Sequence, residues 1–519
     1  MNAALLLEYY ARIADAPDAI ARLRTLVIAL AIRGRITGYM GPWLTTTLGE
    51  IGRWGSGGTP SKAHPEYYGG TIPWLVIGDL NDGIVEGSQS TITRSGVENS
   101  AAKIVEPGAV LIAMYGSIGK LGINAMPCAT NQAIAHCHPS KDCVTRDFLF
   151  WLLRSLREDL LGRGQGVAQQ NISQKILKAW PVRLPTIAEQ HRIVAKVDEL
   201  MALCDQLEAA RAEREAARDS FTLSTLAKLK TSDPETFGEE ARFALANLAP
   251  LTARLDQIKQ LRQTILNVAV RGKLVVQDAA DEPAAALLKR TSDDIEAYCS
   301  ENRVARAKPE PFAEDTAPFG APSGWSWVRL CQLFRVVTDG DHQPPPRADQ
   351  GIAFLTIGNV TTGRLDFDGC RLVPESYFRA LPAYRTPAKG DILYTVVGAT
   401  FGRPALVDSD RDFCVQRHIA ILKPAKTMEI RFLLLLLASP LVYDQAASST
   451  TGTAQPTIAL RPLRNFAVPV PPLAEQHRIV AKVDALMGLC DQLEASITTG
   501  ERTRSRLLKA VVHSALEAA

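Results

Sequence analysis

The sequence lacks the features that define several large classes of protein. Its longest uninterrupted apolar runs, residues 26–32 and 432–438, fall far short of the roughly 20 residues that a membrane-spanning helix needs. The first ten residues contain an acid, Glu8, and no basic stretch ahead of their leucines, so they do not resemble a secretory signal. These absences lead us to expect a cytoplasmic protein that does not bind membranes.

Cysteine is scarce and follows no recognisable pattern. The nine cysteines are an odd number and no two are spaced as Cys-x-x-Cys, so we expect neither a disulfide framework nor a zinc ribbon. The nearest approach to a metal site is the group Cys128, His136, Cys137, His138 and Cys143, whose spacing matches no standard zinc pattern. Buried thiols and loop histidines are the simpler interpretation, and we predict no bound metal.

An excess of one charge and the common catalytic motifs are also missing. The chain has 58 Lys and Arg against 55 Asp and Glu, so any basic surface for nucleic acid must be local. Residues 116–120 (GSIGK) are too short for a phosphate-binding loop and lack the hydroxyl residue after the lysine. No Asn-Pro-Pro-aromatic or Asp-Pro-Pro-Tyr tetrapeptide, typical of enzymes that methylate amino groups, occurs. We therefore expect a chain without catalytic activity of its own.

The sequence does contain a long internal repeat. Residues 188–209 read AEQHRIVAKVDELMALCDQLEA and residues 474–495 read AEQHRIVAKVDALMGLCDQLEA, identical at 20 of 22 positions. A weaker similarity relates residues 20–36 to residues 258–274, both of which contain Arg-Gly followed by a basic residue. At 519 residues the chain is long enough for several domains. It is therefore predicted to be two tandem copies of one unit, in which helices flank a variable block.

The repeated segments have the apolar spacing of a coiled coil. In the first copy the apolar positions follow one another at steps of four and three residues, and the second copy repeats them: Ile193, Val197, Leu200, Cys204 and Leu207. We predict a helix of roughly 40 residues, about 60 Å long, and an antiparallel pairing of the two copies. The alternative is that each helix packs on its own domain. His191 and His477 are expected on the helix surface.

The blocks between these helices share a plan but not their residues. Residues 72–80 (IPWLVIGDL) match residues 352–360 (IAFLTIGNV), and residues 107–123 match residues 389–406. Short β-branched runs interrupted by Gly and Pro predict strands and turns. The predicted fold class is mixed α/β, with two similar domains separated by long antiparallel coiled-coil helices in a pseudo-twofold tandem repeat.

The predicted domain boundaries follow from this plan. They give an N-terminal helical segment at 1–41, a first variable domain at 42–186, a central repeated helical region at 187–274, a linker at 275–322, a second variable domain at 323–472, and a C-terminal repeated helix at 473–519.

Polar loops of the variable domains carry the candidate binding residues. Gln, Asn, Arg and Lys side chains reach the edges of bases, and glycine lets a backbone approach phosphate closely. In the first domain the candidates are Ser56, Thr59, Lys62, Tyr67, Tyr68, Lys120, Gln169, Gln170 and Asn171. In the second domain they are Asp341, His342, Gln343, Arg347, Arg403 and Gln455. Any one of them could belong to an ordinary solvated loop, but the set favours DNA binding.

The order of these motifs resembles the specificity (S) subunit of type I restriction–modification systems, over almost the whole chain. The residues that carry the resemblance are Ser56-Gly57-Gly58-Thr59-Pro60, Ile72-Pro73-Trp74, Gly78-Asp79-Leu80, Gly116-Ser117-Ile118-Gly119-Lys120, Asn131-Gln132, Gln170-Asn171-Ile172-Ser173, both Ala-Glu-Gln-His-Arg-Ile-Val segments, Asp281-Glu282-Pro283-Ala284 and Gly324-Trp325-Ser326-Trp327-Val328. The second domain departs from this pattern, with Val337-Thr338-Asp339-Gly340-Asp341 in place of the Ser-Gly-Gly-Thr-Pro loop.

The resemblance implies a function and a set of partners. Each variable block would be a target recognition domain, and together the two would read a bipartite, asymmetric sequence in double-stranded DNA. Two modification (M) subunits would bind S-adenosylmethionine and methylate adenine, and restriction (R) subunits, where present, would use ATP and Mg for translocation and cleavage. This chain itself would bind no cofactor. The alternatives are a subunit that serves methylation alone, a self-contained DNA-modifying enzyme and a structural coiled-coil scaffold.

Overall fold

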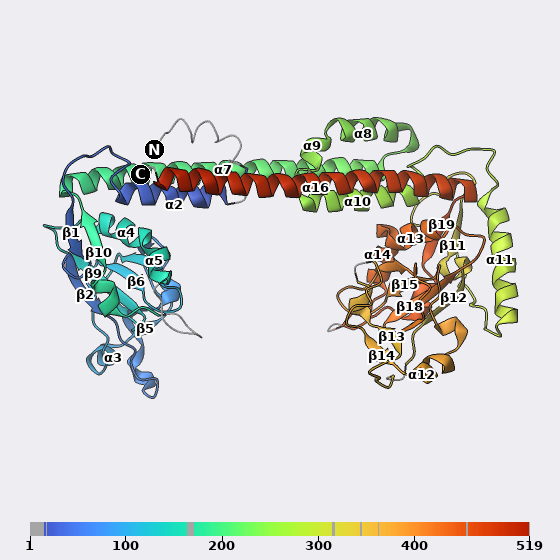
Figure 1. The fold of residues 1–519 in the computed structure, drawn as a ribbon, viewed down its shortest axis with the longest axis horizontal. Coiled ribbons are helices and arrows are strands. Elements are labelled where there is room, and N and C mark those ends of the chain that lie inside the picture. Colours follow the sequence, from blue (N-terminus) through green and yellow to red (C-terminus); the bar gives the residue numbers. More distant parts are fainter. Residues whose placement is uncertain are drawn as a thin grey trace. The chain divides into compact units, whose positions relative to one another are not determined.

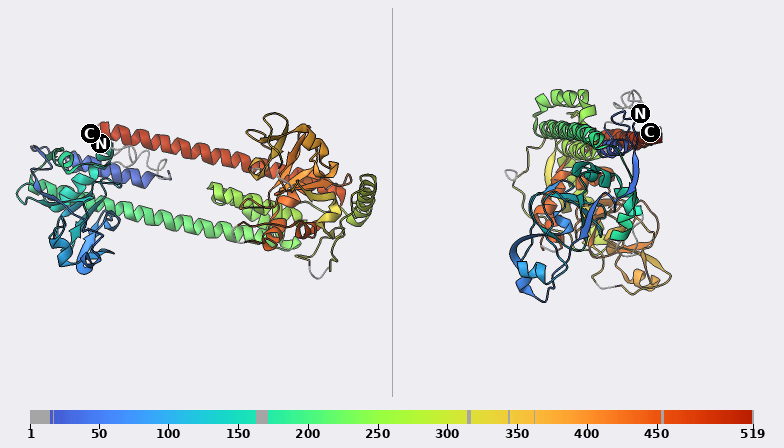
Figure 2. Two further views of the ribbon diagram at one scale, coloured as in Figure 1. Left: turned by 90° about the horizontal axis from the view of Figure 1, so that it is seen from below. Right: turned by 90° about the vertical axis from the view of Figure 1, so that its left-hand side faces the viewer.

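The structure is a computed structural model that describes residues 15–16, 18–162, 171–313, 317–342, 345–361, 363–452 and 455–517. The chain divides into two compact units, drawn in Figures 1 and 2. Unit 1 comprises Met1–Glu215 and Thr499–Ala519, and unit 2 comprises Ala216–Thr498. Each unit contains one of the two variable domains together with parts of the long helices.

The first domain is built on a five-stranded sheet in the order β2-β9-β6-β7-β4, a three-stranded sheet in the order β5-β3-β8, and the separate pair β1-β10. Helices α4 and α5 pack beside the larger sheet (Figure 1). The strands are β1 (Leu44–Thr47), β2 (Gly52–Ser56), β3 (Tyr68–Leu75), β4 (Ile84–Val85), β5 (Thr91–Ile92), β6 (Val110–Ala113), β7 (Leu121–Asn124), β8 (Ala129–Thr130), β9 (Ile134–Pro139) and β10 (Pro181–Leu184). The helices are α3 (Arg94–Glu98), α4 (Arg146–Ser155), α5 (Arg157–Gly162) and α6 (Gln174–Lys178).

The second domain repeats this plan, with a four-stranded sheet in the order β12-β18-β15-β16, a three-stranded sheet in the order β14-β13-β17, and the pair β11-β19. The strands are β11 (Ser326–Arg329), β12 (Phe334–Asp339), β13 (Ile352–Leu355), β14 (Arg371–Val373), β15 (Ile392–Thr395), β16 (Pro404–Leu406), β17 (Phe413–Val415), β18 (Ile419–Pro424) and β19 (Ala467–Val470). The helices are α12 (Glu375–Ala380), α13 (Ile430–Ala438), α14 (Pro440–Ser448) and α15 (Leu460–Arg464).

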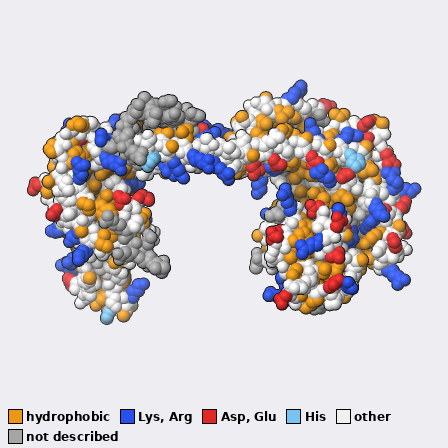
Figure 3. Space-filling model, in the orientation of Figure 1, with side chains coloured by type: hydrophobic (Ala, Val, Ile, Leu, Met, Phe, Trp, Pro, Cys, Tyr) orange, Lys and Arg blue, Asp and Glu red, His pale blue; other side chains and the backbone are white. Residues whose placement is uncertain are grey.

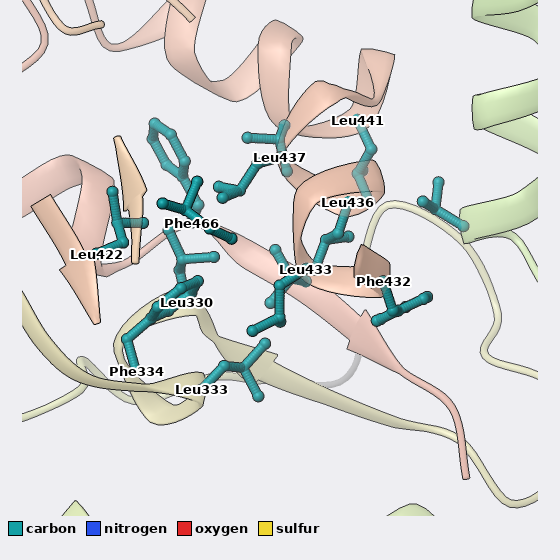
Figure 4. Close-up of a cluster of buried hydrophobic side chains, with 14 of the residues drawn as sticks. Leu330, Leu333, Phe334, Leu422, Phe432, Leu433, Leu436, Leu437, Leu441 and Phe466 are labelled. Atoms are coloured by element: carbon teal, nitrogen blue, oxygen red, sulfur yellow. The ribbon is translucent and has the colours of Figure 1, made fainter. Parts of the chain in front are cut away.

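Helix α13 explains one of the two apolar runs in the sequence. Its leucines Leu433, Leu436 and Leu437 are buried beside Leu333 and Phe334 in one cluster, as Figure 4 shows. A run of seven apolar residues therefore forms the core helix of a domain, where each fully buried leucine contributes about 1.5–3 kcal/mol. Among the described residues no single helix is long and apolar enough to cross a membrane, although α13 and α14, bent by 54° at their junction, pass a test of length and composition as a pair.

Two long helices follow the variable domains. They are α7 (Ile187–Thr231) and α16 (Leu473–Glu517), each of 45 residues, slightly longer than predicted. Ile193 and Val197 are buried in the core of the first domain, and Ile479 and Val483 are buried in the core of the second. The first turns of each helix thus pack on their own domain. The predicted fold class, two similar α/β domains in a tandem repeat with long helices, is confirmed.

The shorter repeated helices, α2 (Ala19–Ile32) and α10 (Leu255–Val270), make the same ion pairs in both units. Arg24 of α2 lies 2.7 Å from Asp205 and 2.7 Å from Glu208 of α7. In unit 2, Arg262 of α10 makes the equivalent contacts with two acids of α16 at 2.7 Å and 2.8 Å. The weak sequence similarity of α2 and α10 therefore reflects the same packing role in each copy.

The predicted linker includes a helix that begins where its Asp281-Glu282-Pro283-Ala284 sequence indicates. It contains α11 (Ala284–Glu301), an 18-residue helix. Leu287 and Ile295 of α11 are buried in the core of unit 2, and Asp294 is paired with Arg335 of β12 at 2.6 Å. This helix therefore belongs to the second domain. The central region also contains α8 (Pro234–Ala246) and α9 (Leu248–Leu251) between α7 and α10.

Candidate nucleic-acid interface

Strand pairing brings several loops of the first domain to one end of its larger sheet. Ser56, the last residue of β2, pairs with Ala135, and Ala113, the last residue of β6, pairs with Ile134. Both partners lie at the start of β9. The loops after β2 and β6 and the turn before β9 therefore leave the sheet together. We call these segments, residues 56–59, 114–120 and 131–133 with Asn171, the loop end of the first domain.

Hydrogen bonds connect the loop end of the first domain. The Thr59 hydroxyl donates to the side-chain oxygen of Gln132. The backbone N–H of Met114 donates to the Ala133 carbonyl at 2.7 Å, which joins the loop after β6 to the turn before β9. A backbone bridge between Tyr115 and Asn171 adds the next segment. The loop end is thus one connected surface rather than a set of independent loops.

Close backbone contacts explain the glycines in this region. A Cβ atom on Gly57 would lie 1.8 Å from the carbonyl oxygen of Thr130, and one on Gly58 would lie 2.3 Å from the backbone of Ala101. No side chain can occupy either position without moving main-chain atoms. The two glycines of the Ser-Gly-Gly-Thr sequence are therefore needed for the chain to pass between β8 and the segment before β6.

The structure brings together some of the predicted binding residues of the first domain. Ser56, Thr59, Lys120 and Asn171 all belong to the loop end. Lys120 donates to the carbonyl oxygens of Ile77 at 3.2 Å and of Gly78 at 3.4 Å, so its ammonium group already holds the segment after β3.

The other predicted residues of the first domain lie elsewhere. Tyr68 begins β3, at the opposite end of that strand from the residue that pairs with Thr130, and its hydroxyl donates to the Pro60 carbonyl at 2.5 Å. Tyr67 stacks on His64 with ring centroids 4.9 Å apart, and Lys62 is exposed. Gln169 and Gln170 lie outside the described residues.

The second domain has an equivalent loop end. Asp339, the last residue of β12, pairs with Ala420, and Thr395, the last residue of β15, pairs with Ile419, so the loops after both strands meet at the start of β18. The Val396 N–H donates to the His418 carbonyl at 3.1 Å, as Met114 does to Ala133 in the first domain. The loop end of the second domain comprises residues 339–342, 396–403 and 416–418 with Thr457.

Charged groups are concentrated at the loop end of the second domain. The His342 ring lies 3.0 Å from the Asp339 carboxylate, and the Tyr377 hydroxyl donates to Asp341 at 2.9 Å. Burial, followed by this hydrogen bond, raises the pKa of Tyr377. A carboxylate held by a tyrosine hydroxyl keeps a fixed direction and retains acceptor capacity for a second donor.

The remaining predictions for the second domain have different outcomes. Arg403 donates to the carbonyl oxygen of Thr361 at 2.6 Å, the same kind of contact that Lys120 makes in the first domain. Arg347 and Gln455 are exposed. Gln343 lies outside the described residues. Over the visible surface, Lys and Arg are interspersed with Asp and Glu (Figure 3), in agreement with the nearly balanced charge of the sequence.

Some residues at the loop ends were not predicted as contacts. They are Tyr115 and Gln132 in the first domain and Arg417 and His418 in the second, together with Tyr377 of α12, which contacts Asp341 of the second loop end. Gln132 in the turn before β9 and Arg417 in the turn before β18 occupy equivalent positions. An alignment of the two strands would have revealed this equivalence.

The Cys and His group in the first domain combines two core thiols with half-buried histidines, His136 and His138, which lie on strand β9 and not in a loop as predicted. Cys128 and Cys137 are buried, and burial lowers the pKa of His136 to about 4. Within the described ranges, no three or more His, Cys, Asp or Glu side chains are grouped so that they could hold a metal ion.

Comparison with known proteins adds independent information. A family model described as "Type I restriction modification DNA specificity domain" matches the chain at residues 40–214 and again at residues 322–499. Each match contains one variable domain and the start of the long helix that follows it.

Individual relatives agree with the family model. The specificity subunits of the type I restriction enzymes EcoAI and EcoEI of Escherichia coli are 26% identical over 388 residues and 27% identical over 391 residues. These regions cover 73% and 70% of this chain but only 66% and 62% of the two relatives. A crystal structure of the HsdS subunit from Thermoanaerobacter tengcongensis has 18% sequence identity and a TM-score of 0.43, covering 92% of this chain and 98% of that one.

Proposed function

The chain belongs to the family of type I restriction–modification specificity subunits and has two target recognition domains, and from this premise we propose that it is the DNA-reading subunit of such a complex. Each target recognition domain reads a few base pairs through its loop end. The two together read a bipartite, asymmetric target and direct adenine methylation by modification subunits and cleavage by restriction subunits. The chain itself is not catalytic.

The observation that carries this proposal is the repetition of one loop end with different side chains. The backbone connections are the same in both domains, but Thr59 and Gln132 in the first give way to His342 and Arg417 in the second. The major groove presents a distinct pattern of donors and acceptors for each base pair, so different side chains on one scaffold select different sequences. A scaffold protein would have no use for this difference.

The partners are inferred from the repeated segments of the two long helices, residues 188–209 and 474–495. Leu203 of α7 and Leu489 of α16 are equivalent residues and are 46% and 53% exposed. Large exposed leucines at the same place in both copies favour two docking sites for the same kind of subunit. We assign these sites to two modification subunits, which bind S-adenosylmethionine, and we assign ATP and Mg to restriction subunits.

The long helices have a further role in the proposal. Each of them belongs partly to unit 1 and partly to unit 2. A continuous helix is a stiff element of defined length, about 1.5 Å per residue. We propose that α7 and α16 set the number of unread base pairs between the two half-sites, as the geometry of a dimer sets half-site spacing in other DNA-binding proteins.

Co-expression with the neighbouring methyltransferase gene tests the proposal. Methylated adenines would be mapped across a host genome by single-molecule sequencing. We expect two short specific sequences separated by a fixed unspecified gap. Exchange of residues 42–186 for the matching domain of another family member should change one half of the target only. A soluble complex that leaves the genome unmethylated, or a chain that binds no methyltransferase, contradicts the proposal and favours the scaffold.

A further inference from the structure

The turn before β9 places one long side chain at the centre of the loop end of the first domain. The Ile134 N–H donates to the Asn131 carbonyl at 3.2 Å, which closes the turn, and Gln132 is the exposed residue inside it. The Thr59 hydroxyl donates to the side-chain oxygen of Gln132. The amide is thereby oriented by the loop after β2. Its two N–H groups have no partner among the described residues, and its oxygen can accept a second hydrogen bond.

The turn before β18 has the same construction in the second domain. The Ile419 N–H donates to the Gln416 carbonyl at 3.0 Å, and Arg417 is the exposed residue inside the turn. The Nε of Arg417 lies 3.4 Å from Nε2 of His418. Gln132 and Arg417 therefore occupy the same place in two copies of one fold, and each is held by one neighbour.

The contact with His418 determines which groups of Arg417 remain available. Burial of the ring, followed by the nearby arginine charge, lowers the pKa of His418, so its imidazole is neutral near pH 7 and its Nε2 can accept from the guanidinium. The two terminal NH2 groups of Arg417 have no partner in the described part of the chain. They form the fork that binds two acceptors at once.

Other cations of the two loop ends are occupied by the protein itself. Lys120 and Arg403 donate to backbone carbonyls of their own domains. Gln132 and Arg417 are therefore exposed long side chains at the loop ends that keep hydrogen-bonding groups without a partner among the described residues. They also differ between the two domains.

We propose that Gln132 and Arg417 are equivalent base-reading positions, with Gln132 reading an adenine in one half-site and Arg417 reading a guanine in the other. The assignment rests on the proposed function. A side-chain amide matches the N6 and N7 edge of adenine, and a guanidinium matches the O6 and N7 edge of guanine, each through two hydrogen bonds. Thr59 and His418 are positioning residues, because each orients the reading side chain through one hydrogen bond.

The test uses the full chain in complex with its methyltransferase partner. Genome-wide methylation would be mapped for the wild-type chain, for Arg417→Gln and for Gln132→Arg, and rates would then be measured on duplexes that differ at one base pair. Arg411→Gln is the matched control. Arg411 precedes β17, at the opposite end of that strand from Arg417, and its guanidinium lies 4.8 Å over the Phe367 ring.

The expected result is a change at one position of one half-site. The Arg417→Gln complex should prefer adenine where the wild type requires guanine, with the original target methylated at least about tenfold more slowly. Gln132→Arg should make the converse change in the other half, and Arg411→Gln should change neither. A wild-type target read unchanged by Arg417→Gln or by Gln132→Arg overturns the inference.

If Arg417→Gln abolishes methylation completely, a second variant, Arg417→Lys, shows whether base reading or the structure has been lost. Lysine retains a cationic donor for guanine. Retained methylation of the original target by Arg417→Lys supports base reading. Loss in Arg417→Lys as well, in an assembled complex, shows a structural requirement and overturns the inference. Failure of the proposed function is distinguishable from either outcome, because the wild-type complex would then yield no bipartite target before any variant is made.

Discussion

Gln190 of α7 and Gln476 of α16 hold the two target recognition domains by the same hydrogen bond. The side-chain oxygen of Gln190 accepts from the backbone N–H of Thr145 at 2.8 Å, and that of Gln476 accepts from Glu429 at 3.2 Å. Thr145 and Glu429 are the N-cap residues of α4 and α13. The Ala-Glu-Gln sequence that begins both long helices is therefore required inside each domain, independently of any partner.

The first prediction concerns this glutamine. Gln190→Ala should lower the stability of unit 1 by about 2 kcal/mol, because the fully buried side chain also donates to the carbonyl oxygens of Cys143 and Pro185 and these groups would lose their partners. Thermal unfolding should shift by roughly 5 °C. Gln206→Ala, at an exposed position of the same helix, is the control and should have little effect. Equal stability of the two variants would contradict the assigned role.

The second prediction concerns the pH dependence of a buried glutamate. Burial raises the pKa of Glu475, whose one oxygen accepts from the Trp325 indole N–H at 2.9 Å while the other, in the described structure, lacks a hydrogen-bond partner. The folded state therefore binds a proton at Glu475 more tightly than the unfolded state does. The contribution of this group to the stability of the folded protein is consequently lost as the pH rises from about 4.5 through the folded pKa. Glu475→Gln should be more stable than the wild type at pH 7, and the difference should vanish below pH 4.

The equivalent residue of the first copy provides a matched comparison. Glu189 accepts from the Thr37 hydroxyl and lies 2.8 Å from the Arg192 guanidinium. Glu189→Gln removes this ion pair, so it should not stabilise the protein at pH 7. Urea titrations of both variants between pH 4 and pH 8 measure the difference. Both glutamates are buried, so an identical response of the two variants would show that the ion pair with Arg192 does not offset the burial of Glu189.

The repeat, the fold class and the position of the loops could be predicted from the sequence, because each depends on local patterns. Apolar spacing identifies the helices, and glycine-rich turns lie between short strands. The sequence could not predict which polar side chains bind the protein itself and which remain available for a ligand. Lys120 and Arg403 look like ligands for phosphate, but each binds a carbonyl that is distant in sequence. Only the fold reveals which long side chains remain available.

The apolar positions of the long helices also show that sequence patterns do not reveal which contacts a residue makes. Of the five positions that spacing identified as one apolar stripe, Ile193, Val197 and Cys204 are buried, whereas Leu200 is half-buried and Leu207 is 39% exposed. Periodicity cannot say what covers a stripe, however, and Ile193 and Val197 are covered by their own domain. Leu203 of the same helix is 46% exposed and lies outside this apolar spacing, so the pattern did not identify it as a contact residue.

The third prediction concerns that leucine and its counterpart. Leu203→Asp should reduce binding to one modification subunit per chain, and Leu203→Asp with Leu489→Asp should abolish it, with little change in thermal stability because both side chains are exposed. Mass measurement of the purified complexes counts the subunits. Leu223→Asp is the control, since Leu223 is 59% exposed on α7 but lies outside the repeated sequence. Two subunits bound by the double variant would refute the assignment of these sites.

The fourth prediction concerns the gap between the two half-sites. Insertion of seven residues after Glu215 in α7 and after Thr498 in α16, at the boundary between the units, lengthens both helices by roughly 10 Å, which corresponds to about three base pairs. A heptad nearly preserves the face that each helix presents, so the contacts of Arg24 and Arg262 with their acids should survive. The methylated target should keep both specific halves and gain about three unread base pairs. The same insertion after Lys308, in the extended part of the linker, should leave the gap unchanged, because that segment belongs to unit 2 alone. If the gap stays constant after the helical insertions while methylation persists, the helices do not set the spacing, and the docking of the modification subunits must do so instead.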